Sequence, residues 1–143
     1  MRMDKCFEVG RDRDHAVSVV GREETLARLF PESRTEIVGR KGDRVTARTH
    51  YAALGREGVA TFHFDYLMDG NVRFEKVCDG NVWKELRGEL IFDEPDDGGA
   101  GCTVTIEMEG RTKGLVPEFT IRGPMKEQLE QMAEALRREI EES

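Results

Sequence analysis

The sequence predicts an α+β fold in which a curved antiparallel sheet wraps around a long C-terminal helix, with a short helical segment after the first strand. Between Arg34 and Arg111, apolar and polar residues alternate with a period of two, which is typical of strands that bury one face. After Gly123-Pro124, apolar residues recur at helical spacing. A chain of this length fits one domain, so we expect a single domain over residues 1–143.

The N-terminal part contains two short apolar runs, Cys6–Val9 and Ala16–Val20. They are consistent with one long bent strand or with two separate strands, and the pattern does not choose between them. The apolar residues of Glu23–Phe30 then lie three and four apart, which predicts a short helix with acidic residues in its first turn. Pro31 ends that helix.

Six apolar runs separated by short turns follow, and they predict a meander whose strands pair in sequence order. In the run Val82–Phe92, Lys84 falls in the same alternation as Leu86, near the mouth of any pocket. A bulge would instead turn Lys84 outward and leave Trp83 inside. The alternation places these residues on the inner face: Val45, Ala47, Thr49, Tyr51, Ala53, Phe62, Phe64, Tyr66, Met68, Leu86, Leu90, Phe92, Cys102, Val104, Ile106 and Met108.

The apolar face of this sheet needs a cover, since leaving it in water would expose a large patch. Proline is favoured in the first turn of a helix, so we expect the C-terminal helix to begin at Gly123-Pro124. It would run for about five turns, roughly 27 Å. Its apolar stripe consists of Met125, Leu129, Met132, Leu136 and Ile140, with Ala133 beside them.

This order of elements resembles the SRPBCC or START-like superfamily, which includes polyketide cyclase/dehydratase-like and birch-pollen-allergen-like proteins. The resemblance spans nearly the whole chain and rests on order rather than on one motif. Its carriers are Glu23–Pro31, Leu86–Phe92, the loop Pro95–Gly101 leading into Cys102–Thr105, and the terminal helix. The resemblance implies a helix-grip fold with a cavity between sheet and helix that holds an apolar ligand, such as a lipid, a polyketide or a quinone.

The inner-face residues agree with such a cavity, because methionine adapts to varied apolar shapes and aromatic rings supply wall. A methionine and aromatic stripe is, however, more often ordinary core than a ligand site. A void below about 100 Å³ would be too small, since ligand sites usually measure ~300–1,000 Å³. The candidate ligand-binding residues are Thr49, Tyr51, Phe62, Phe64, Tyr66, Met68, Leu86, Leu90, Val104, Ile106, Met108, Met125, Leu129 and Met132.

Composition narrows the functional classes. The formal charge is −7, and an acidic domain repels phosphate backbones, so nucleic acid is not an expected partner. The sequence contains neither an apolar run long enough to span a bilayer nor an N-terminal signal core, and we expect a cytoplasmic protein. The scattered cysteines Cys6, Cys78 and Cys102 predict three small core residues rather than disulfides or a zinc site. We expect no metal and no cofactor, and the oligomeric state is left open.

Candidate catalytic groups are few. His63 and Asp65 share a strand face, but it is the face opposite the aromatic residues, and His50 likewise points outward. His15 lies in a charged stretch and is expected at the surface. A carrier without chemistry is therefore the leading hypothesis. The alternatives are a cyclase or dehydratase that uses Tyr51 or Tyr66, and a protein-interaction module.

Overall fold

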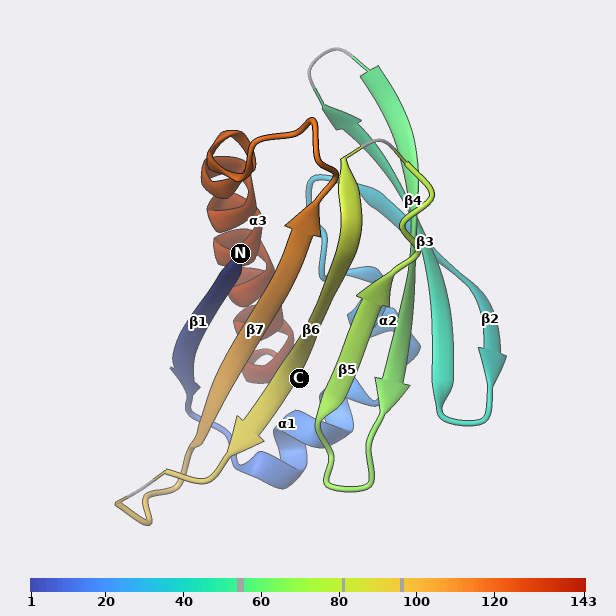
Figure 1. The fold of residues 1–143 in the computed structure, drawn as a ribbon. Helices are drawn as coiled ribbons and strands as arrows, with labels where there is room; N and C mark the ends of the chain where they lie inside the picture. Colours follow the sequence, from blue (N-terminus) through green and yellow to red (C-terminus); the bar gives the residue numbers. More distant parts are fainter. Residues whose placement is uncertain (54–55, 81, 96) are drawn as a thin grey trace.

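The protein has an α+β fold, which the computed structural model describes for residues 1–53, 56–80, 82–95 and 97–143 (Figure 1). Seven strands and three helices account for most of these residues. In chain order they are β1 (Arg2–Val9), α1 (Arg13–Val20), α2 (Glu23–Ala27), β2 (Arg34–Lys41), β3 (Arg44–Ala53), β4 (Arg56–Tyr66), β5 (Val72–Lys76), β6 (Trp83–Asp93), β7 (Cys102–Thr112) and α3 (Glu118–Glu141).

The strands form one antiparallel sheet in the order β1-β7-β6-β5-β4-β3-β2. The meander from β2 to β7 follows the sequence order, and β1 joins the far edge beside β7. All three helices lie on one face of the curved sheet, with α3 beside β1 and β7 (Figure 1). The predicted fold class, including the six-strand meander and the long terminal helix, is confirmed.

The two faces of the sheet differ as the alternation predicts. The inner face carries the buried apolar residues, whereas ion pairs cover the outer face. Arg44, for example, donates from Nε to Asp65 Oδ1 at 2.7 Å, and this contact lowers the pKa of the Asp65 carboxyl. His63 also lies on this face, where its Nδ1 is 2.9 Å from Thr46 Oγ1. The outward placement of His63 and Asp65 is confirmed.

The apolar run Ala16–Val20 belongs to helix α1, so both strand alternatives for it were wrong. The local cause is a helix cap. Asp12 Oδ1 accepts a hydrogen bond from the His15 backbone N–H at 2.8 Å, which satisfies a donor at the N-terminus of α1. Ala16, Val19 and Val20 then fall on one buried side of the helix. A five-residue apolar run does not by itself distinguish a buried strand from a helix.

Helix α3 begins at Glu118, six residues before the start predicted from Gly123-Pro124. Pro117 occupies the N-cap position, so the chain enters the helix at this earlier proline. Pro124 lies inside the helix, where it has no N–H to donate to Thr120 O. The 24 residues of α3 span about 36 Å, which is longer than predicted.

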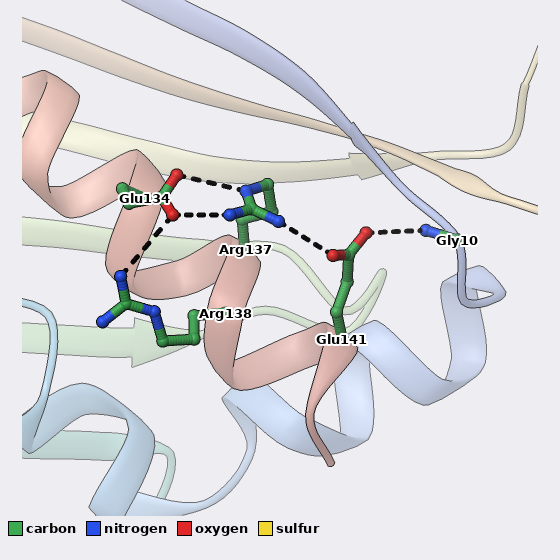
Figure 2. A network of polar contacts seen from close by, with 5 residues as sticks. All are labelled: Gly10, Glu134, Arg137, Arg138 and Glu141. Atoms are coloured by element: carbon green, nitrogen blue, oxygen red, sulfur yellow. Dashed lines mark hydrogen bonds and ion pairs between the residues drawn. The ribbon is translucent and has the colours of Figure 1, made fainter.

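Polar contacts link residues in the C-terminal half of α3 to one another and to Gly10, in the segment between β1 and α1 (Figure 2). Glu141 Oε1 accepts a hydrogen bond from the backbone N–H of Gly10 at 3.2 Å, while its Oε2 accepts one from Arg137 Nη1 at 2.9 Å. Arg137 also donates to Glu134, whose carboxyl pKa is lowered by that bond. These groups are exposed, so each contact contributes little to stability, and the bond between Glu141 and Gly10 joins this end of the helix to the segment between β1 and α1.

The cysteines differ from one another in burial. Cys102 is buried and Cys78 is partly buried, but Cys6 is exposed, so its prediction as a core residue was wrong. Cys6 lies on the edge strand β1, where Phe7 takes the inward position instead. All three thiols are free. None of the helices in the described ranges has an apolar stretch long enough to span a membrane.

Candidate ligand-binding site

A pocket of about 440 Å³ lies between the inner face of the sheet and the N-terminal half of α3. Strands β3 to β7 form its wall, the segment between α2 and β2 forms its floor, and α3 forms its roof. Its lining residues are Leu29, Phe30, Pro31, Glu32, Ser33, Thr49, Tyr51, Ala52, Ala60, Phe62, Phe74, Lys76, Gly80, Val82, Trp83, Leu86, Met108, Pro124, Met125, Glu127, Gln128, Gln131 and Met132.

The pocket occupies only one end of the space between sheet and α3, because α1 and α2 fill the other end. Helix α1 contacts β6 and β7, and α2 contacts β2 and β3. Their buried residues, including Val19, Val20 and Leu26, pack there at 0–1% exposure. Phe30 marks the boundary, where its ring stacks on Phe62 with the centroids 5.2 Å apart.

Aromatic residues form much of the pocket wall, and glycines make room for two of them. A Cβ on Gly110 would lie 2.6 Å from Trp83 Cζ3, and one on Gly88 would lie 2.3 Å from Phe74 Cζ. Only glycine therefore permits these rings to lie flat against the sheet. A bulge at the start of β6 buries Trp83 and turns Lys84 outward, which settles the alternative left open by the sequence.

The polar side chains that line the pocket are Glu32, Ser33, Thr49, Tyr51, Lys76, Glu127, Gln128 and Gln131. Thr49 is buried, and its Oγ1 lies 3.0 Å from Thr35 Oγ1, so its hydroxyl already has a partner. Tyr51 is 41% exposed at the mouth, where its ring covers Gly58 of the neighbouring strand. Lys76 lies on the inner face directly across from Phe62 and donates from Nζ to Val77 O at 3.3 Å.

The described part of the chain contains no buried side-chain nitrogen or oxygen without a hydrogen-bond partner. None of the histidines lines the pocket. His15 lies between α1 and α3, with Nε2 3.2 Å from Ile140 O, and so is half-buried rather than a plain surface residue. His50 pairs with Glu36 on the outer face. Nor do the described ranges gather three or more potential metal ligands in one place.

Twelve of the fourteen candidate residues fall into two groups. One group lines the pocket: Thr49, Tyr51, Phe62, Leu86, Met108, Met125 and Met132. A second group is buried in the packed core instead: Phe64, Leu90, Val104, Ile106 and Leu129. The structure packs this second group in the core, and α1 and α2 cover the part of the sheet on which its strand residues lie.

Met68 and Tyr66 are also placed differently from the prediction. Strand β4 ends at Tyr66, so Met68 lies in the following turn and is fully exposed, at 107%. Tyr66 is half-buried, and its hydroxyl donates to Val20 O at 2.7 Å. Burial raises the pKa of its phenol to about 12. Tyr66 thus supports helix α1 and does not line the pocket.

Several lining residues were not among the candidates, although the sequence contained signals for some of them. Phe74 and Lys76 alternate with Arg73 and Glu75, which is the inner-face pattern of the short strand β5. Leu29 and Phe30 lie on the apolar side of the predicted short helix. The polar roof residues Gln128 and Gln131 carry no such signal, because they lie beside the apolar stripe of α3.

The sequence matches no protein-family profile and no curated protein. Several solved structures, in contrast, match over nearly their whole length. The Thermus thermophilus protein TTHA0849 has a TM-score of 0.78 at 17% identity, with 98% of this chain and 97% of that chain covered. A START superfamily protein from Mycobacterium smegmatis has a TM-score of 0.77 at 19% identity, with 99% and 97% covered.

An aromatase/cyclase from Streptomyces sp. R1128, Zhui, has a TM-score of 0.66 at 17% identity, with 96% of this chain and 94% of that chain covered. At such low identity these likenesses establish the fold. The chain therefore has the START-like helix-grip fold that its order of elements predicts.

Proposed function

We propose that this protein binds an apolar small molecule, such as a lipid, a polyketide or a quinone, in the pocket between the sheet and α3. The observation that carries the proposal is the pocket itself. Its volume of about 440 Å³ falls in the range of ligand sites. Apolar side chains make up most of its wall, among them aromatic rings and three methionines.

The solved structures of the same fold support this proposal. They include a START superfamily protein and several aromatase/cyclases, one of them from the steffimycin biosynthetic pathway. A carrier needs only a cavity and an opening, and every group seen in this pocket is compatible with that role. We therefore propose binding or transport rather than catalysis.

Trp83 allows a direct test, because it is the single tryptophan of the chain and lines the pocket. Its emission should change saturably when sterols, fatty alcohols or quinones are titrated into the protein. Dodecanol is a suitable first probe, since it is neutral and flexible. An emission spectrum unaffected by all of these compounds would contradict the proposal.

A matched pair of variants controls for indirect effects. Ala60 lines the pocket, whereas the preceding residue Val59 is 52% exposed on the outer face. Ala60→Leu should fill part of the pocket and weaken dodecanol binding about tenfold, since it removes space that the ligand occupies. Val59→Leu adds one methylene on the opposite face and should leave binding unchanged.

A cyclase or dehydratase-like activity is the second candidate function, favoured by Tyr51 at the pocket mouth and by the aromatase/cyclases of the same fold. Of the two tyrosines considered for this role, only Tyr51 lines the pocket. If the protein turns over a poly-β-ketone substrate, Tyr51→Phe should abolish turnover while substrate binding persists. Turnover that is unchanged in this variant would remove Tyr51 from the mechanism.

A further inference from the structure

Among the described lining residues, Lys76 is the only cationic side chain of the pocket. It lies two residues after Phe74 on β5 and therefore on the same inner face. Its cross-strand partner is Phe62, which is 7% exposed and forms part of the apolar wall. Lys76 is thus an inward-facing lysine beside an apolar part of the pocket wall.

The ammonium group of Lys76 has little compensation for this position. It forms no ion pair with the described residues, and its one hydrogen bond goes to the carbonyl of the adjacent Val77, at 3.3 Å. Glu32 and Glu127 also reach the pocket, but both are exposed and screened by water. A partly buried cation is costly unless a counter-ion or strong acceptor approaches it.

We propose that the pocket selects an amphipathic ligand with an anionic group, a carboxylate or an equivalent oxyanion, that pairs with Lys76 while the apolar body lies against Trp83 and Met108. This inference rests on the proposed function and adds the chemical class of the ligand. The pocket provides both parts of such a site. Its aromatic and methionine wall fits an alkyl chain or ring system, and Nζ of Lys76 supplies up to three donors for an oxyanion.

Two ligands that differ only in their head group test this inference. Dodecanoate and dodecanol share the same chain length, and binding of each can be followed by Trp83 emission below the micelle concentration. Wild-type protein should bind dodecanoate about tenfold more tightly, the lower range for a hydrogen bond to a charged group because Lys76 is partly exposed. Dodecyltrimethylammonium should bind more weakly than either.

Variants of Lys76 separate charge from shape. Lys76→Gln should lose about tenfold in dodecanoate affinity but keep dodecanol binding, which also shows that the pocket is intact. Lys76→Arg should retain the preference for dodecanoate. Lys84→Gln is the matched control, because Lys84 is exposed on the outer face next to the reporter Trp83. It should change neither affinity.

The outcomes distinguish this inference from the proposed function. Equal affinities for dodecanoate and dodecanol in the wild type, or equal losses of both in Lys76→Gln, would overturn the anionic ligand while leaving an apolar-ligand protein. Absence of binding by dodecanoate, dodecanol and the wider panel would overturn both proposals.

Discussion

The two ends of α3 face the same sheet but have different surroundings. At the C-terminal end, Leu136 and Ile140 are fully buried against a core that α1 and α2 complete, and Arg28 and His15 contact the helix there. At the N-terminal end, Met125 and Met132 line the pocket. Residues 119–133 make no ion pair with another element within the described ranges.

This difference shows how one fold produces both a core and a cavity. A single helix does not fill the concave face of a strongly curved sheet, so the remaining space must be filled by additional elements or remain open. Helices α1 and α2 fill it at one end. At the other end the segment from Leu29 to Ser33 enters, and it forms the floor of the pocket.

The largest expected difference is in the free energy of unfolding lost when a side chain is shortened to alanine at one end of α3 or at the other. Leu136→Ala should lower the free energy of unfolding by about 3 kcal/mol, because it opens a cavity in a filled core. Met125→Ala should cost about 1 kcal/mol, since its side chain already borders open space. Urea unfolding of both variants measures this difference, and equal costs would argue against an open N-terminal end.

Enlarging two alanines, one in the core and one at the pocket wall, also tests whether the core is filled and the pocket open. Ala47 is fully buried away from the pocket, so Ala47→Leu should overpack the core and cost about 2 kcal/mol. Ala60→Leu adds the same atoms at the pocket wall and should remain within about 1 kcal/mol of wild type. Thermal and urea unfolding measure both. A larger loss in Ala60→Leu would indicate that the pocket is filled.

The two tyrosines also lie on different sides of this contrast, because Tyr66 bonds to α1 in the core and Tyr51 lines the pocket. Tyr66→Phe removes the hydrogen bond to Val20 O and should cost about 1 kcal/mol at neutral pH. The folded-state pKa of Tyr66, about 12, lies above its ordinary value of 10.0, so the unfolded chain loses this proton first. Stability should therefore fall as pH rises from about 10 to about 12, and this part of the loss should disappear in Tyr66→Phe.

Tyr51→Phe is the control for that measurement, because Tyr51 is 41% exposed and its hydroxyl has no bond to α1. Its unfolding free energy should match the wild type at neutral pH. An alkaline profile that is the same in wild type and Tyr66→Phe would refute the role assigned to Tyr66.

The smallest expected effect on stability and on ligand binding is that of substituting Met68. Because its side chain is fully exposed in the turn after β4, Met68→Ser should change stability by less than about 0.5 kcal/mol and leave dodecanol binding unchanged. The same substitution at Met132, which is 1% exposed and lines the pocket, should reduce both. Weaker ligand binding by Met68→Ser would restore Met68 to the site.

The sequence was sufficient to predict which residues face inward along most strands, because alternation is a local property. Phe62, Phe64, Leu86 and Met108 all lie on the predicted face. The sequence was insufficient to predict which of these inward residues line the pocket, because that depends on what packs against the face. Whether an inward residue such as Phe64 or Phe62 meets core or pocket depends on where α1 and α2 lie, which no local pattern specifies.

Other errors have local physical causes. Ala16–Val20 is too short and too uniformly apolar for its period to identify a helix, and the cap at Asp12 decides the outcome. Pro124 is compatible with a helix start, but Pro117 takes that role. The position of Trp83 depends on a bulge in β6, which an alternating pattern allows but does not require.

A crystal structure of the protein soaked with dodecanol would show whether the space between the sheet and the N-terminal half of α3 holds an apolar ligand. We expect continuous density for an alkyl chain bordered by Trp83, Met108 and Met132, with Leu136 and Ile140 unmoved. A pocket closed by those same side chains, with dodecanol absent or bound only on the outer surface, would contradict this expectation.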